Sequence, residues 1–221
     1  MKTLVVDVGG TNIKVLATGR REPIKIPSGP RLTPRRMVRS VRDATAAWRY
    51  DRVSIGFPGP VVHGQAVRDP WNLGKGWLGF DFRKAFGRPV RLINDAAMQA
   101  LGSYAGGRML FVGLGTGLGS TMIRDGMLIP MELAHLPYRN GYSYEEYLGE
   151  DGMKRLGKRS WRRHIAKVTQ LFMAAFEIDY VVYGGGNARH LRTLPPGTRL
   201  GNNANAFKGG FRLWSGDYIP R

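Results

Sequence analysis

The sequence predicts an α/β protein built from two related lobes with a cleft between them. Each half of the chain begins with an apolar run, a glycine-rich turn and a second apolar run, and only later adds helices and a further strand. The first turn is Gly9–Thr11 and the second is Gly113–Ser120. A repeated order of elements indicates two copies of one layered architecture.

The first half opens with a strand pair, Leu4–Val8 and Asn12–Thr18, joined by the first glycine turn. Thr33 and Pro34 supply an N-cap and a first-turn proline for a helix that is expected to run to about Tyr50. The other elements expected in this half are strands at Val53–Phe57 and Val90–Ile93, a hairpin at Val61–Val67, and helices at Phe80–Phe86 and Ala96–Tyr104.

The second half is expected to contain strands at Met109–Leu114, Ser120–Arg124, Met127–Ile129 and Tyr180–Tyr183. The segment Tyr142–Phe176 has a mostly helical pattern, interrupted near Gly149–Gly152 and again at Gly157. A closing helix is expected at Asn203–Trp214. We therefore place an N-terminal lobe at 1–105, with a C-terminal helix at 203–216 as a candidate addition to it, and a C-terminal lobe at 106–202.

Composition indicates a folded protein without disulfides. The 221 residues include no cysteine, which also excludes thiolate metal sites. No apolar stretch approaches the roughly 20 residues that span a bilayer, and the first apolar run is too short for a signal peptide. These features predict a cytoplasmic protein that does not enter a membrane.

The charge balance is strongly basic. Lys and Arg number 34 against 16 Asp and Glu, which gives a formal net charge of +18. Such a charge favours a polyanionic partner: nucleic acid, inorganic polyphosphate or an anionic membrane surface. Simple solubility, or an arginine-favouring composition bias, explains the charge equally well.

Two glycine loops and an Asn-Asp pair carry the chemistry. Glycine lets backbone N–H groups approach an anion without an intervening Cβ. Asn94 and Asp95 close the apolar run Val90–Ile93. A phosphate held from two sides beside a carboxylate is the layout of a phosphotransferase. The alternatives are an Asp7 that only caps a turn and an Asp95 that only caps the following helix.

Seven segments follow one another in the order of a known family: Asp7–Lys14, Gly56–Val61, Trp71–Leu73 with Trp77, Leu92–Asp95, Leu114–Gly119, Glu132–His135 and Gly184–Gly186. At these residues the chain resembles the actin-like sugar kinases, among them the ROK family and, within it, the polyphosphate glucokinase branch. The resemblance extends from Asp7 to about Gly210. It implies two ribonuclease-H/actin-like lobes with a central cleft, and an expected homodimer.

The resemblance also implies a function and a set of site residues. The expected reaction moves a phosphoryl group from inorganic polyphosphate, ATP or both to the 6-hydroxyl of glucose or a related hexose, with Mg²⁺ as cofactor. Asp95 stands where the family has its catalytic base, and Asp7 where it holds the metal. The sugar-binding residues implied are Asn72, Asn94, Asp95, Glu132 and His135. The donor-binding residues implied are Gly9, Gly10, Thr11, Asn12, Lys14, Gly115, Thr116, Gly117, Gly184, Gly185 and Gly186.

This sequence departs from the family pattern at a few positions. Ala97 and Ser103 stand where the family usually has acidic or amide residues, and Ala134 replaces a glycine. The absence of cysteine removes the zinc site that ROK kinases commonly carry, as it does in the polyphosphate glucokinase branch. These departures leave the identity of the acceptor sugar open.

Basic pairs repeat every four residues in one segment. They are Lys154-Arg155, Lys158-Arg159 and Arg162-Arg163, followed by Lys167. On an unbroken helix they would form a cationic ladder rising about 6 Å a step, which favours polyphosphate over ATP. Gly157 and the potential N-cap Ser160 predict a break instead, and a solvated charged face is the alternative.

The alternative function for the whole protein is a non-catalytic sugar-, nucleic-acid- or other polyanion-binding protein on the same fold.

Overall fold

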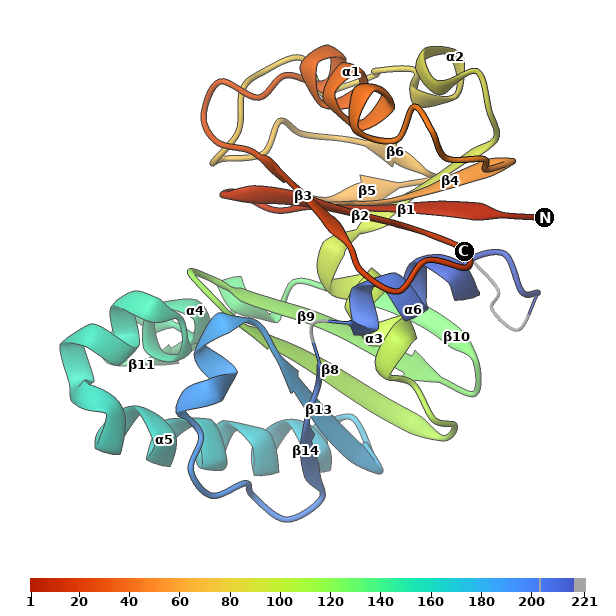
Figure 1. Cartoon of the computed structure of the whole chain (residues 1–221). Helices are drawn as coiled ribbons and strands as arrows, with labels where there is room; N and C mark the ends of the chain where they lie inside the picture. The colour runs from red at the N-terminus through yellow and green to blue at the C-terminus, as the bar shows by residue number, and fades with distance from the viewer. Residues whose placement is uncertain (203, 217–221) are drawn as a thin grey trace. The chain divides into compact units, whose positions relative to one another are not determined.

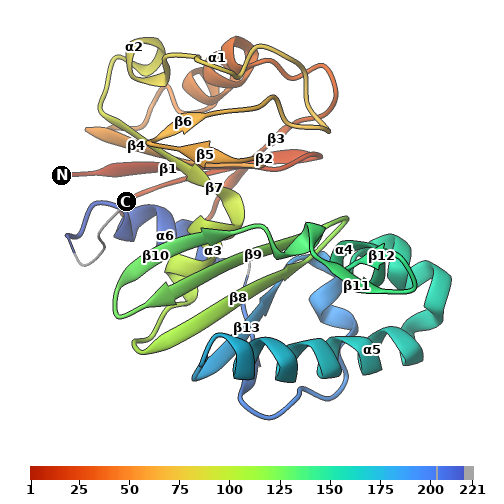
Figure 2. The ribbon, with the colours of Figure 1, turned by 180° about the vertical axis from the view of Figure 1, so that it is seen from behind.

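A computed structural model describes residues 1–202 and 204–216 (Figures 1 and 2). These residues form two compact units. Unit 1 comprises Met1–Met98 with Ala206–Gly216, and unit 2 begins at Gln99 and ends at Asn205. The domain boundaries drawn at 105 and 202 stay a prediction, and residue 203 of the expected closing helix lies outside the described residues.

Unit 1 contains a five-stranded sheet with the order β3-β2-β1-β4-β7. The strands are β1 Thr3–Val8, β2 Asn12–Ala17, β3 Ile24–Pro27, β4 Arg52–Phe57 and β7 Val90–Asn94. β1, β2 and β3 run antiparallel, whereas β1, β4 and β7 are parallel. A small hairpin pairs β5 Val61–Val62 with β6 Gln65–Ala66. The helices α1 Pro34–Ala44 and α2 Phe82–Phe86 lie on one face of this sheet (Figures 1 and 2).

The first helix begins as predicted and ends earlier than predicted. The Thr33 hydroxyl accepts a hydrogen bond from the Arg36 backbone N–H, and Pro34 is the first helical residue. The Thr45 hydroxyl donates to the carbonyl of Val41 at 2.7 Å at the other end. Beyond it the chain leaves the helix, so that Trp48 and Tyr50 pack against the core of unit 1. Burial of these aromatic rings explains why the helix does not reach Tyr50.

Unit 2 repeats the same sheet order, β10-β9-β8-β13-β14. Its strands are β8 Arg108–Leu114, β9 Leu118–Arg124, β10 Met127–Met131, β13 Tyr180–Gly184 and β14 Thr198–Leu200. β8, β9 and β10 are antiparallel, and β8, β13 and β14 are parallel. The predicted repeat is thus confirmed. The strands β3 and β14 were not predicted, because both are short, incompletely buried edge strands.

The remaining elements begin with α3 Asp95–Ser103, close to its prediction. Unit 2 adds the 3₁₀ turns η1 Leu133–His135 and η2 Gly186–His190, the hairpin of β11 Pro137–Arg139 and β12 Tyr142–Ser143, and the helices α4 Tyr144–Leu148 and α5 Glu150–Ala175. The closing helix is α6, Asn205–Arg212. It packs Ala206 and Phe207 against Val5 and Met98 of unit 1.

Helix α5 is broken at Gly157, as predicted. This residue has φ 72° and ψ 151°, a conformation essentially restricted to glycine. After the break, Trp161, Ile165, Val168 and Phe172 form the buried stripe. The expected cationic ladder is therefore not continuous.

Two of its arginines are engaged locally. The Arg155 guanidinium lies 4.4 Å from the ring centre of Tyr142, and Arg162 donates from Nε to the carbonyl of His190 at 2.7 Å. These contacts support the alternative of a charged surface for this segment.

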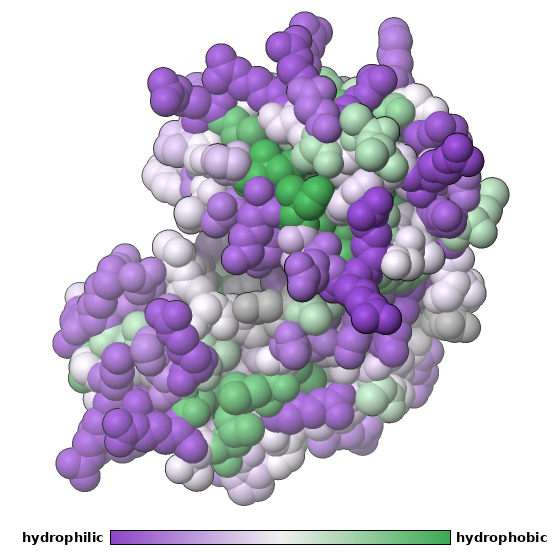
Figure 3. Space-filling view, in the orientation of Figure 1, coloured by the Kyte–Doolittle hydropathy of each residue, from purple (hydrophilic) through white to green (hydrophobic). Residues whose placement is uncertain are grey.

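In the described ranges, no helix is long and apolar enough to cross a membrane. Hydrophilic side chains and smaller hydrophobic patches are interspersed on the face shown in Figure 3.

Candidate active site

The first glycine loop is held in shape by contacts within unit 1. The Gly9 N–H donates to the carbonyl of Asn12 at 3.0 Å, which closes the turn between β1 and β2. Ser28, just after β3, donates from its hydroxyl to the Gly9 carbonyl at 2.7 Å and from its N–H to the Thr11 carbonyl at 3.0 Å. Thr11 lies exposed at the tip of this loop.

A carboxylate and an ammonium group face each other across the strands that bear this loop. Asp7 on β1 is the register partner of Lys14 on β2. The Lys14 Nζ lies 3.6 Å from the Asp7 Oδ2. Burial raises the pKa of Asp7, and the neighbouring Lys14 charge opposes that rise. Both residues were predicted from the first motif.

The Asn-Asp pair lies at the junction of β7 and α3. Asn94 caps the helix, since its Oδ1 accepts from the Ala97 N–H at 3.1 Å while its Nδ2 donates to the Gly59 carbonyl at 3.1 Å. Asp95 is the first helical residue, and its Oδ1 accepts from the Ala96 N–H at 2.8 Å. The capping role proposed as the alternative for Asp95 thus belongs to Asn94.

The Asp95 carboxyl is electrostatically perturbed. Burial, followed by the negative charge of Asp7, raises its pKa to about 7, while hydrogen bonds from backbone N–H groups, including that of Ala96, oppose the rise. A carboxyl group that titrates near neutral pH is suited to accept a proton in a reaction step. Such perturbed groups are concentrated at functional sites.

The buried Asp7 carboxylate, next to Asp95, offers an oxygen ligand to a hard divalent cation. Each carboxylate feels burial, and Asp7 acts on Asp95 through its charge, so that a cation would relieve both. No cluster of three or more His, Cys, Asp or Glu side chains that could hold a metal occurs among residues 1–202 and 204–216. Mg²⁺ fits this arrangement because it binds through one or two carboxylates and keeps several waters.

Asn72 approaches the first glycine loop from the segment between β6 and α2. A Cβ on residue 10 would collide with the Asn72 side-chain amide, so glycine at this position leaves room for that amide. The segment is fixed by Asp69, whose Oδ1 accepts from the N–H groups of Gly76 and Trp77 at 3.0 and 2.8 Å. Unit 1 thus assembles the first loop, Asn72 and the two aspartates predicted from sequence.

The second glycine loop, between β8 and β9, is contacted by a carboxylate that the sequence motifs did not predict. Glu145 on α4 accepts from the Leu118 N–H at 3.0 Å through Oε2. A Cβ on Gly117 would collide with the same oxygen. The N-cap Ser143 and its capping-box partner Glu146 place Glu145 in the first turn of α4. This capping box is the sequence signal that could have found it.

The third glycine segment lies beside the second loop. Gly184 pairs with Gly113 across β13 and β8, and the side-chain amide of Asn187 donates to the Gly115 carbonyl at 3.0 Å. Gly185 has φ 79° and ψ 164°, and a Cβ there would collide with the backbone of Leu114. Close approach of two backbones therefore requires this glycine.

Glu132 and His135 lie together at η1 in unit 2. The Glu132 Oε2 is 3.9 Å from the His135 Nε2, and the two side chains are 68% and 73% exposed. The turn is anchored by the Ser120 hydroxyl, which accepts from the Leu133 N–H at 3.2 Å and donates to the Met131 carbonyl at 2.9 Å. Both polar side chains remain available to a ligand.

Comparison with known proteins defines the class. The family model described as the ROK family matches residues 3–130, which is more than half of the chain. The chain therefore belongs to the ROK family. It shares the two-lobed α/β fold of solved ROK sugar kinases, as the sequence predicted.

Its similarity extends to particular members. The chain is 29% identical over 208 residues to the polyphosphate glucokinase of Mycobacterium tuberculosis (strain CDC 1551 / Oshkosh), covering 83% of this chain and 77% of that protein. The solved inorganic polyphosphate/ATP-glucomannokinase of Arthrobacter sp. strain KM is 25% identical, with a TM-score of 0.80 over 98% of this chain and 99% of that one. A ROK glucokinase of Streptomyces griseus, solved with glucose and AMPPNP, shares the fold at 17% identity and a TM-score of 0.73, over 96% and 99% of the two chains.

Proposed function

We propose that this glucokinase-type sugar kinase transfers a phosphoryl group from inorganic polyphosphate, ATP or both to the 6-hydroxyl of glucose or a related hexose. The observation that carries the proposal is the placement of the buried Asp95 carboxyl at the first turn of α3, held by the Ala96 N–H and the Asn94 cap and within reach of the Asp7 charge. The similarity to polyphosphate glucokinases supports the choice of donor and acceptor.

Asp95 acts as the general base in this proposal. A sugar hydroxyl is a poor nucleophile until its proton is accepted as the new O–P bond forms. The hydrogen bond from Ala96 to Oδ1 fixes the carboxylate at the first turn of α3. Asn94 holds this turn in place through its cap and its bond to Gly59.

The glycine loops bind the donor phosphates. In unit 1 the loop residues Gly9, Gly10, Thr11 and Asn12 offer backbone N–H and hydroxyl donors, with Lys14 as a nearby cation. In unit 2, Gly115, Thr116 and Gly117 play this part, with Gly184–Gly186 beside them. Positioning and electrostatic stabilisation are the main catalytic contributions in phosphoryl transfer.

Asp7, together with waters, would hold the Mg²⁺, which neutralises phosphate charge when bound. Asn72, Asn94, Glu132 and His135 bind sugar hydroxyls in this proposal. Their amide, carboxylate and imidazole groups would lose hydrogen bonds with an analogue lacking a hydroxyl, and that loss supplies selectivity. We also propose that the protein is a homodimer and that it is cytoplasmic. Light scattering on the purified protein tests the oligomeric state.

The test is a coupled assay for glucose 6-phosphate with Mg²⁺ and either polyphosphate or ATP, run beside Asp95→Asn. We expect turnover that falls by about 10²–10⁴-fold in the variant, as is typical for loss of a general base. Turnover with ATP alone would remove polyphosphate from the proposal. If no hexose, N-acetylated ones included, is phosphorylated with either donor, the protein is a non-catalytic binding protein and the proposal is wrong.

A further inference from the structure

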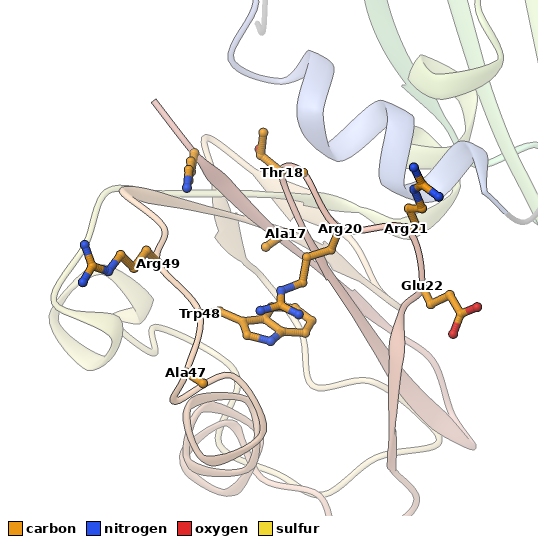
Figure 4. A pocket seen from close by; sticks show the side chains of 10 residues that line it. Ala17, Thr18, Arg20, Arg21, Glu22, Ala47, Trp48 and Arg49 are labelled. Carbon is orange, nitrogen blue, oxygen red and sulfur yellow. The ribbon is translucent and has the colours of Figure 1, made fainter.

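A pocket of about 860 Å³ lies in unit 1 at a place that the proposed reaction does not use. It is formed by the residue before β1, the turn after β2 and the segment between α1 and β4 (Figure 4). Its charged lining residues are Lys2, Arg20, Arg21, Arg49 and Glu22. Four cations against one carboxylate give this pocket a strong preference for anions.

The basic side chains of the pocket lack ion-pair partners among the described residues. An adjoining pocket of about 620 Å³ shares Arg49 and adds Arg42 and Arg88. The acidic side chains there are Asp43 and Asp51, and Asp51 accepts a hydrogen bond from the Lys2 backbone N–H at 2.7 Å. The basic surface thus continues from one pocket into the next.

An aromatic contact holds one guanidinium in a defined position. Arg20 lies over the indole of Trp48, 4.4 Å from the ring centre, while the side chains of Arg49 and Arg21 point away from this pair (Figure 4). A guanidinium stacked on a ring keeps its N–H groups free at the edge, where they match the geometry of phosphate oxygens. The stacked Arg20 therefore loses less conformational freedom on binding an anion than a freely rotating side chain would.

The same contact argues against a nucleic acid as the occupant. Sequence-tolerant binding of single strands uses exposed aromatic rings on which bases stack. Here Trp48 is covered on one side by Arg20 and packs against the core of unit 1. An anion without bases suits this pocket better.

The pocket lies at the opposite end of the first sheet from the candidate catalytic residues. Lys2 directly precedes β1, and Asp7 lies on β1 five residues after Lys2. At roughly 3.3 Å per residue this separation is about 16 Å. A short donor bound near Asp7 cannot contact the pocket, but a long chain of phosphates can.

We propose that this pocket, which we call the Trp48 pocket, binds a distal stretch of inorganic polyphosphate and anchors long donor chains. The inference rests on the proposed function, since it assumes polyphosphate as the donor. It adds a second contact between enzyme and donor, remote from the phosphate that is transferred.

The experiment compares two triple variants of equal charge change. In the first, Arg20→Gln, Arg21→Gln and Arg49→Gln are combined. In the control, Arg35→Gln, Arg39→Gln and Arg83→Gln remove three exposed arginines of the same unit that do not line either pocket. Binding of long-chain polyphosphate is measured by titration calorimetry without sugar, and KM is measured for long-chain polyphosphate, tripolyphosphate and ATP.

We expect the first variant to lose about tenfold in affinity for long-chain polyphosphate and the control to lose much less, because ionic contacts localise the chain. The KM for tripolyphosphate and for ATP, and kcat with ATP, should stay unchanged. Equal losses in both triple variants, no loss in either, or an equal rise of KM for tripolyphosphate would overturn the proposal. The proposal would also be overturned if the first variant lost as much affinity for single-stranded RNA as for long-chain polyphosphate.

The calorimetric and kinetic readouts separate the two proposals. If wild-type protein phosphorylates no sugar yet the calorimetric difference appears, the proposed function fails and a polyanion pocket remains. If sugar is phosphorylated and the calorimetric difference is absent, the Trp48 pocket fails alone.

Discussion

The two glycine loops occupy equivalent places in sheets of the same strand order, yet they carry different chemistry. The first joins β1 to β2 and follows Asp7, whose carboxylate faces Lys14 at 3.6 Å. The second joins β8 to β9, and at the matching point of β8 the chain has Gly113 paired with Gly119. The same order of strand, turn and strand therefore carries a charged residue pair in unit 1 and two closely approaching backbones in unit 2.

The glycines of the second region serve packing as much as ligand binding. Gly185 approaches the Leu114 backbone and Gly117 approaches the Glu145 carboxylate. In the first region, Gly10 instead leaves room for the Asn72 amide. Substitutions that remove a charge near the first loop should therefore lower activity. Substitutions that add a Cβ where backbones approach closely in unit 2 should lower stability.

The largest expected effect concerns the charge in the first region. Asp7→Asn should lower kcat by about 100-fold or more, since a charge aimed at the metal and the reacting phosphate is lost. Thr116→Ala in the second loop removes one hydroxyl donor and should lower kcat/KM for the donor by roughly tenfold. Steady-state kinetics with saturating Mg²⁺ measures both, and equal losses would contradict the assignment of charge to the first loop alone.

A second effect concerns backbone approach in unit 2. Gly185→Ala should lower the free energy of unfolding by about 2–4 kcal/mol, because φ 79° with ψ 164° is a glycine-only conformation and the methyl group meets Leu114. Gly186→Ala is the matched control, with no atom within 4 Å of its Cβ. It should stay within about 0.5 kcal/mol of wild type in urea unfolding. Similar losses in both variants would show that crowding at Gly185 is unimportant.

A third effect separates Asp95 from its surroundings by pH. Burial and the Asp7 charge raise its pKa to about 7 in the metal-free protein, and bound Mg²⁺ opposes that rise. Activity should therefore fall about tenfold per pH unit on the acid side of a midpoint below about 7, where the base is protonated. Asp7→Asn removes the neighbouring negative charge, so the midpoint of this fall should move to lower pH. A pH profile of kcat/KM measures both, and an unmoved midpoint would contradict the coupling.

The same pKa predicts the sign of a stability change in the metal-free protein. The folded carboxyl holds its proton more tightly than the unfolded one, whose pKa is 3.8. Stability is therefore lost as pH rises from about 4 to about 7. Asp95→Asn, which stays neutral, should gain about 1–2 kcal/mol at pH 8 and nothing near pH 4. Thermal melts at the two pH values measure this, and a gain at pH 4 alone would reverse the sign.

The smallest effect compares two glutamates of unit 2. Glu145→Ala leaves the Leu118 N–H without its 3.0 Å acceptor and should cost about 1 kcal/mol of stability. Glu132→Ala removes only an exposed carboxylate 3.9 Å from His135 and should cost less than about 0.5 kcal/mol. Chemical denaturation measures both. A larger cost for Glu132→Ala would mean that this turn is structural and would weaken its proposed sugar-binding role.

Much of the fold was predictable because its signals are local. The apolar runs and glycine turns at β1–β2 and β8–β9, and the proline and threonine at the start of α1, all lie within a few residues of the elements that they define. The early end of α1 was not predictable in this way, since it depends on where Trp48 and Tyr50 find a core. The edge strands β3 and β14 were missed because both are short and only partly buried, so that their apolar pattern is weak.

The candidate site divides similarly. Sequence motifs predicted Asp7, the glycine loops and the Asn94-Asp95 pair, and their functional roles stay predictions. The roles within the pair came from the structure, in which Asn94 takes the cap and Asp95 keeps a perturbed carboxyl group. The contact of Glu145 on α4 with the second loop was not predicted from the sequence, and neither was the Trp48 pocket.

The sequence by itself determined the order of strands and turns, the repeat and the family, because these depend on residue type and spacing along the chain. The tertiary structure alone decided which glycines are required by close approach, which carboxyl groups are buried beside each other, and where Arg20 meets Trp48. The physical reason is that burial, charge coupling and stacking depend on distances between residues far apart in the chain. No local pattern encodes those distances until the strands have paired.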